Sequence, residues 1–102
     1  MRKVTEETVK AFFAGKNKTV GNTTIRSIGG VTKMLLHGNC IAIRDSEGGP
    51  VRVRHAGWTT NTTKERLNGI IDHEGIDGIR QVKFSWKWKG GEQFPDGWTA
   101  VE

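Results

Sequence analysis

The sequence predicts an α+β fold, in which two short helices pack on one face of an antiparallel sheet of about five to six strands. Two segments repeat apolar residues at helical spacing, and several others alternate apolar and polar residues as half-buried strands do. Fourteen glycines against two prolines allow many tight turns. The expected order is α-β-β-β-β-α-β-β, and residues 1–102 are expected to form a single domain around one core.

The first helix is expected between Thr5 and Gly15. Thr5 is followed by two glutamates, which is typical of a helix start because a hydroxyl caps free amides and carboxylates favour the positive end of the helix dipole. Val9, Phe12 and Phe13 then repeat at i, i+3 and i+4, which predicts an apolar stripe facing the sheet. Gly15 can end the helix.

Four strands are expected at residues 22–28, 31–37, 40–45 and 51–55. The pairs Gly29-Gly30 and Gly38-Asn39 suit two-residue hairpin turns between the first three. Within 51–55, Val51 and Val53 alternate with Arg52 and Arg54, which indicates one packed face and one wet face.

A second helix is expected to begin near Thr62 and to end before Gly75. Thr62 and Glu65 match the S/T-x-x-E capping box. Leu67, Ile70 and Ile71 repeat at i, i+3 and i+4 and predict the buried stripe of this helix.

A long strand is expected over residues 79–90. Its apolar positions are Val82, Phe84, Trp86 and Trp88. They alternate with Lys83, Ser85, Lys87 and Lys89. This pattern predicts an aromatic face packed in the core and a basic face in solvent, with a last short strand within residues 97–101.

The charge of the chain is positive. Lysine and arginine number 16 against 11 acids, which gives a formal net charge of +5. If the helices cover the apolar face, the opposite face of the sheet exposes Arg26, Arg44, Arg52, Arg54, Lys83, Lys87 and Lys89. Such a face suits nucleic-acid phosphates, although cations also simply solvate an exposed sheet. Convergence of these cations on one open face would favour nucleic acid, and scatter would favour a protein partner.

Two tryptophans in loop-like settings are candidates for anchoring a partner. Trp58 and Trp98 each follow a glycine. The candidate partner-binding residues are Trp58, Asn61, Lys64, Arg66 and Trp98. The alternative is that the segment around Lys64 only caps and packs the second helix.

No catalytic signature is found in the sequence. Three histidines have no spacing typical of a metal site or a nucleophile-base pair, and no phosphate-binding or zinc-binding motif occurs. The protein is therefore expected not to be an enzyme and to need no cofactor or metal. The single Cys40 and the lack of a signal peptide or membrane span predict a cytoplasmic location.

The segments LHGNCIAIRD and GWTTNTTKERLNG resemble a pattern in small proteins of tailed bacteriophages whose function is unknown. The resemblance covers most of the chain and includes Trp98 near an acidic C-terminal stretch. It implies a phage product in the host cytoplasm and transfers no catalytic or binding residue. The leading hypothesis is a non-catalytic protein that engages a host protein or complex; the alternative is nucleic-acid binding through the basic sheet face.

Overall fold

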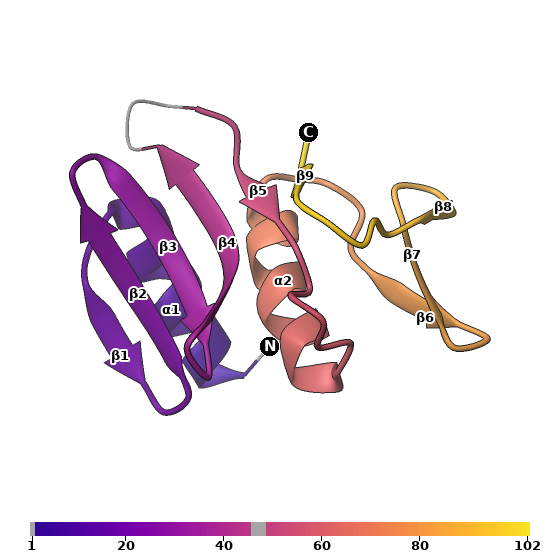
Figure 1. Cartoon of the computed structure of the whole chain (residues 1–102), viewed down its shortest axis with the longest axis horizontal. Coiled ribbons are helices and arrows are strands. Elements are labelled where there is room, and N and C mark those ends of the chain that lie inside the picture. Colours follow the sequence, from indigo (N-terminus) through magenta and orange to yellow (C-terminus); the bar gives the residue numbers. More distant parts are fainter. Residues whose placement is uncertain (1, 46–48) are drawn as a thin grey trace.

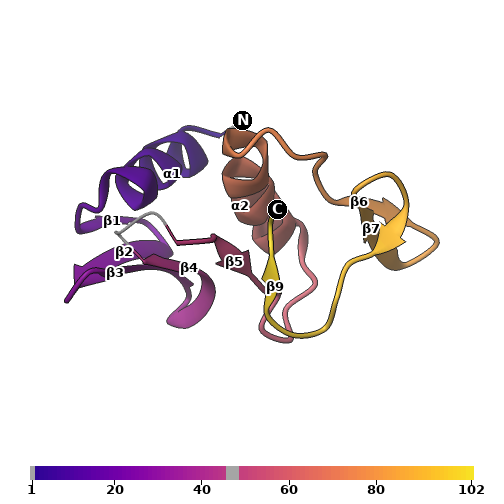
Figure 2. The same ribbon diagram turned by 90° about the horizontal axis from the view of Figure 1, so that it is seen from above.

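The α+β class is confirmed by the computed structural model, which describes residues 2–45 and 49–102. Two helices lie on one face of a six-stranded antiparallel sheet, and a three-stranded sheet lies to one side (Figures 1 and 2). The elements are α1 (Lys3–Ala14), β1 (Lys18–Val20), β2 (Thr23–Ile28), β3 (Val31–Leu36), β4 (Asn39–Asp45), β5 (Arg52–Val53), α2 (Asn61–His73), β6 (Arg80–Val82), β7 (Ser85–Trp88), β8 (Glu92–Gln93) and β9 (Thr99–Ala100).

The larger sheet has the strand order β1-β2-β3-β4-β5-β9. All of its pairs are antiparallel, and the last strand of the chain returns to pair with β5. Helix α1 contacts β1, β2 and β3, while α2 contacts α1 and β4. The helices therefore cover one face of this sheet and leave the other face open, as Figure 2 shows from above.

Strand alternation sorts the side chains between the two faces. In β3, Thr32, Met34 and Leu36 are buried, whereas Lys33 between them is exposed. The turn after β3 differs by one residue from the prediction, because Leu36 pairs with Asn39 and the turn is His37-Gly38. Strand β1 was not predicted.

Helix α1 ends at the predicted residue but begins earlier. Gly15 adopts a left-handed conformation (φ 67°) and its N–H donates to the helix carbonyls, as a C-terminal cap does. The prediction that Thr5 caps the N-terminus is wrong, since the helix starts at Lys3 and Thr5 is fully buried within it. The Thr5 hydroxyl donates instead to Glu65 Oε1 of α2, at 2.8 Å.

Helix α2 is capped by a different threonine from the one predicted. Its N-cap is Thr60, whose Oγ1 accepts the Thr63 N–H at 3.2 Å. The predicted capping box of Thr62 and Glu65 is therefore wrong. The Glu65 carboxylate reaches α1 rather than back along its own helix, because a tertiary partner is available there.

Arg66 of α2 connects its own helix to α1 and to the six-stranded sheet. Its guanidinium is 2% exposed and donates to Thr5 of α1 at 2.6 Å and to Thr23 of β2 at 3.0 Å. It also pairs with Glu65 at 2.8 Å. Among the described residues, no buried side-chain nitrogen or oxygen lacks a hydrogen-bond partner. A satisfied buried charge of this kind fixes how the elements dock, since each bond needs a defined geometry.

The late tryptophan-rich segment is not one strand. Val82 pairs with Ser85, so Lys83 and Phe84 form a two-residue turn between β6 and β7, both with positive φ. The prediction that Val82 and Phe84 face the core is wrong: they are 41% and 97% exposed. The turn breaks the alternation because two left-handed residues reverse the chain direction.

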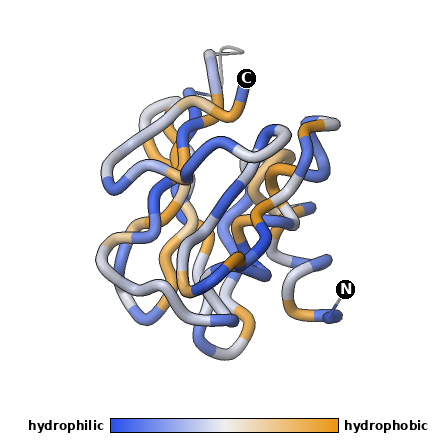
Figure 3. The backbone as a smooth tube through the Cα atoms, turned by 90° about the vertical axis from the view of Figure 1, so that its right-hand side faces the viewer, coloured by the Kyte–Doolittle hydropathy of each residue, from blue (hydrophilic) through white to orange (hydrophobic). Residues whose placement is uncertain are grey.

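Within β7 the predicted alternation holds. Trp86 and Trp88 are buried at 7% and 3% exposure, and both pack edge-on against Phe94. These rings join the same hydrophobic cluster as the main sheet. Figure 3 shows hydrophobic and hydrophilic residues interleaved along the chain, as expected for strands that bury one side.

We expect Arg66→Ala to lower the free energy of unfolding by roughly 3 kcal/mol, because it leaves the hydroxyls of Thr5 and Thr23 without their donor and removes the buried partner of Glu65. Urea denaturation measures this. Lys64→Ala, one position outside the network, should change it by less than about 0.5 kcal/mol. Equal effects of the two substitutions would contradict the role given to Arg66.

Candidate functional site

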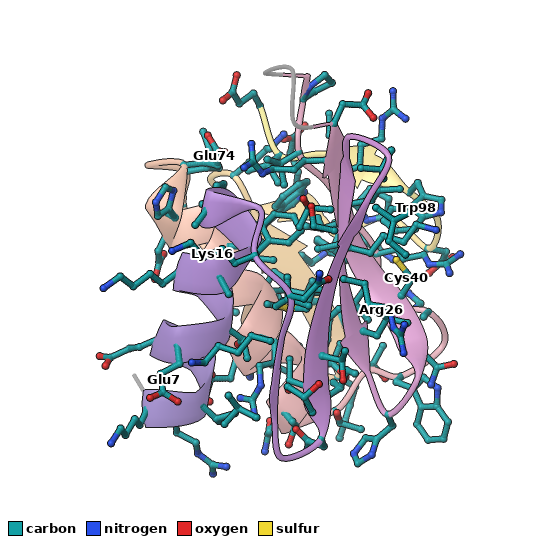
Figure 4. The ribbon with its side chains drawn as sticks, turned by 90° about the vertical axis from the view of Figure 1, so that its left-hand side faces the viewer. Glu7, Lys16, Arg26, Cys40, Glu74 and Trp98 are labelled. Carbon is teal, nitrogen blue, oxygen red and sulfur yellow. The ribbon has the colours of Figure 1, made fainter. Side chains whose placement is uncertain are left out.

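The open face of the six-stranded sheet is the candidate site. Figure 4 shows Arg26, Cys40 and Trp98 on the side of the sheet away from the helices, with Glu7 and Glu74 on the helix side. The separation follows from strand period, since neighbouring residues such as Ile25 and Arg26 point to opposite faces; Ile25 is fully buried.

A row of directly opposed residues crosses this face. Arg26 of β2 faces Lys33 of β3, and Lys33 faces Ile43 of β4. Ile43 faces Arg52 of β5, which faces Ala100 of β9. Opposed residues of antiparallel strands share a face. Three long cations on three strands therefore point the same way; we call Arg26, Lys33, Arg52 and the adjacent Arg54 the cationic row.

The pairing of Arg26 with Lys33 is unfavourable by itself, because like charges directly opposite each other on a sheet repel. Within residues 2–45 and 49–102, no carboxylate lies within 4 Å of any side-chain nitrogen in the cationic row. Asp45 belongs to the same face but lies opposite Val31, two residues along β4 from the row. An anion bound on this face would relieve the repulsion.

Arg54 places an aromatic ring beside the row. Its guanidinium lies 4.4 Å from the centroid of the Trp98 ring, and its Nε donates to the Cys40 carbonyl at 2.8 Å. Trp98 remains 40% exposed. This side of the sheet thus presents cations and an indole together.

The row borders a depression of ≈ 560 Å³ that is also lined by Cys40 and Ile43. Burial raises the pKa of the Cys40 thiol, while the charges of Lys33 and Arg54 lower it. A neutral, half-buried thiol is a weak nucleophile and packs as a small hydrophobe.

The sequence matches the family model described as Kyanoviridae Gp96 protein over residues 1–100. The chain belongs to this phage protein family. This confirms the resemblance to tailed-bacteriophage proteins that its two polar segments indicated. A search of curated proteins and a search of solved structures found no match.

Of the predicted nucleic-acid-binding residues in this phage protein, Arg26, Arg52 and Arg54 converge on the open face. Lys33 was missed, although the alternation of Thr32, Met34 and Leu36 was sufficient to place it there. Lys33 was overlooked because it is the single charged residue in the segment 31–37, which therefore does not stand out as basic.

The prediction that Arg44 lies on the open face is wrong. The pairing of β3 with β4 shifts register between Met34 and Leu35. Arg44 pairs with the buried Thr32, so the Arg44 side chain points toward the helices. The guanidinium donates to the carbonyls of Phe12 and Phe13 at the end of α1. A cation there satisfies free carbonyls and favours the negative end of the helix dipole.

Lys83, Lys87 and Lys89 belong to the β6–β7 region and not to the strands of the cationic row: Lys87 is in β7, Lys83 is in the turn before it and Lys89 directly follows it. Lys87 stands opposite Arg80 of β6, and Lys89 sits 4.3 Å from the Trp88 ring centroid and donates to the Ala100 carbonyl.

The predicted partner-binding residues are also separated. Arg66 is buried in the network with Thr5, so its side chain is not on the surface. Trp58, 56% exposed, borders an apolar pocket of ≈ 250 Å³ at the start of α2. Asn61 and Lys64 lie in the first turn of that helix, whereas Trp98 is on the open face.

The three histidines lie in different surroundings: His37 near Asn22, His55 beside Asp96 and His73 stacked on Phe13. In the described part of the chain, no group of three histidine, cysteine or acidic side chains is arranged to hold a metal ion. None of the described helices is long and apolar enough to cross a membrane.

Glu74, the C-cap of α2, has a raised pKa. Its causes are burial and then the hydrogen bond to and charge of Glu102, opposed by His73 and Arg44. A carboxyl with a raised folded-state pKa contributes stability that is full below its unfolded pKa and is lost as pH rises through the folded pKa.

Glu74→Gln should therefore be more stable than the wild type near neutral pH and equal to it in acid. Because solvent screens this partly exposed group, the gain is expected to stay below about 1 kcal/mol. Thermal unfolding across pH measures it, with Glu92→Gln on exposed β8 as the control. The same pH profile for both variants would contradict the assignment.

Proposed function

We propose that this phage protein is a non-catalytic nucleic-acid-binding protein that acts in the host cytoplasm and contacts phosphates through the open face of its six-stranded sheet. The observation that supports it best is the opposed pair Arg26 and Lys33, which continues through Ile43 to Arg52. Cations that have no carboxylate within 4 Å among the described residues are suited to an anionic partner, and the repulsion between them falls when phosphate binds.

The spacing of the row suits a polyanion better than a single small anion. Arg26 and Arg52 are three strands apart, which corresponds to about 14 Å at the usual strand spacing. One phosphate cannot contact both ends, whereas a chain of phosphates lying across the strands can. Such contacts carry no sequence information, so affinity is expected to depend on salt rather than on sequence.

The double variant Arg26→Glu/Arg52→Glu should weaken binding of labelled DNA and RNA oligonucleotides by more than about tenfold, because two attractive contacts become repulsive. Four phosphate contacts give an expected slope of log affinity against log salt of roughly 3 in magnitude. The double variant loses two of these contacts and should reduce that slope by roughly 1.5. Fluorescence anisotropy at several salt concentrations measures both.

The matched control is Lys3→Glu/Lys10→Glu, which makes the same change of net charge on exposed positions of α1. Its affinity should fall only slightly. An equal loss in the two double variants, or no binding to DNA or RNA at low salt by the wild type, would refute the proposal.

A second candidate function is binding of a host protein, favoured by exposed Trp58 beside its apolar pocket. Capture of one defined host protein should then survive nuclease treatment. It should be lost in Trp58→Ala and retained in Arg26→Glu/Arg52→Glu. Capture that disappears with nuclease would instead assign the contact to nucleic acid.

A further inference from the structure

The tip of the β6–β7 hairpin exposes an aromatic ring in an unfavourable backbone conformation. Phe84 is 97% exposed, and Lys83 and Phe84 have φ of 49° and 69°. This left-handed region places a side chain close to the following carbonyl, so bulky residues rarely occupy it.

The other turns of this kind in the described residues avoid the problem. Consecutive residues with positive φ also occur at Gly29-Gly30, His37-Gly38, Ala56-Gly57 and Lys89-Gly90, the last of which continues into Gly91. In each of these pairs the second residue is glycine, which enters the conformation without a steric penalty. Only the β6–β7 turn places a phenylalanine there, and its ring gains almost nothing from burial. Folding does not explain this residue, and strain at an exposed position points to a functional role.

The hairpin that carries the ring is well anchored. Directly after the turn, Trp86 and Trp88 are buried and pack on Phe94, with ring centroids 5.9 and 4.9 Å apart respectively. Phe84 is thus presented on a fixed base rather than on a loose loop.

The surroundings of the ring are polar. Phe84 borders a depression of ≈ 340 Å³ that is also lined by Gln81, Ser85 and Gln93, residues whose side chains can donate and accept hydrogen bonds. Asp96 lies at the same depression and pairs with His55.

On β6 and β7, Arg80 stands directly opposite Lys87. Neither has a carboxylate within 4 Å in the described part of the chain. The smaller sheet therefore repeats the feature of the cationic row: two opposed cations that an anion would stabilise.

We propose that Phe84 is a base-stacking residue for single-stranded nucleic acid. An unpaired base stacks on the ring, its polar edge meets Gln93 at the depression beside the ring, and neighbouring phosphates contact Arg80 and Lys87, which lie on the same face of the small sheet as Gln93. Stacking accepts every base, because each has a π-face, and it requires a base that is not held in a duplex. This inference rests on the proposed function and adds to it the class of nucleic acid.

An anionic membrane surface is a less suitable partner for the same hairpin. The exposed apolar residues at the tip are Val82 and Phe84, a small area to bury among lipids. Membrane insertion also gives the polar groups of the depression beside the ring no hydrogen-bonding partner, whereas the edge of a base can bond to them.

The test uses a short oligothymidylate that carries one 2-aminopurine, whose fluorescence is quenched by stacking. Phe84→Gly should weaken binding by about 5- to 100-fold and abolish protein-induced quenching, whereas Phe84→Trp should keep both. The slope of log affinity against log salt should stay unchanged in Phe84→Gly, since no phosphate contact is lost.

Phe84→Gly should also raise Tm by several degrees, because glycine removes the backbone strain. Loss of binding then cannot be attributed to unfolding.

The outcomes separate the two proposals. Wild-type affinity in Phe84→Gly, together with weakened binding in Arg26→Glu/Arg52→Glu, overturns base stacking and leaves the proposed function intact. A loss in Phe84→Trp as large as in Phe84→Gly also overturns it, as does a lower Tm in Phe84→Gly. Binding to phosphatidylserine vesicles that depends on Phe84, with no binding to the oligonucleotide, would assign the hairpin to membranes and remove both nucleic-acid proposals.

Discussion

The buried guanidinium of Arg66 is the constraint on which the arrangement of this protein depends. It is bonded to α1 through Thr5 and to β2 through Thr23, from its own position on α2. A charge with 2% exposure is tolerated only when its donors are paired, so these partners must meet on one side of the sheet. Both helices are thereby held on the same face, and the opposite face is left to solvent. The cationic row is exposed because both helices lie on the opposite face of the sheet.

Much of the fold follows from local sequence patterns. Apolar spacing located both helices, and alternation located β2 to β5. A last short strand was also predicted, but its pairing with β5 was not. The errors in helix capping share a cause, which is that tertiary partners override local preferences. Thr5 and Glu65 match capping patterns, yet they bond to each other across two helices, and Thr60 caps α2 instead. No local signal distinguishes a threonine that caps its helix from one that is bonded to a distant element.

The candidate site was predictable to the extent that strand period determines the face. That reasoning placed Arg26 and Arg52 correctly and, if applied to 31–36, places Lys33 as well. It failed for Arg44, where a register shift and the end of α1 determine the direction of the side chain. It failed again at Phe84, because an unbroken alternation conceals a turn made of two residues that seldom form one. Neither position can be predicted without knowing the path of the backbone.

The two sheets share an arrangement that their folding does not require. Arg26 opposite Lys33 and Arg80 opposite Lys87 each place like charges side by side. Such pairs lower stability, and proteins retain local strain and repulsion mainly where a ligand relieves them. The cations on the open sheet and the exposed ring on the anchored hairpin are the two features on which the proposed binding of single-stranded nucleic acid rests.

The most direct test is to map the contact surface by ¹⁵N–¹H chemical-shift changes while titrating the protein with single-stranded oligothymidylate. The account predicts that the largest changes fall on β2, β3 and β5 and on the β6–β7 turn, while the outer face of α1 stays unchanged. Changes confined to α1 and α2, or centred on the pocket beside Trp58, would contradict it.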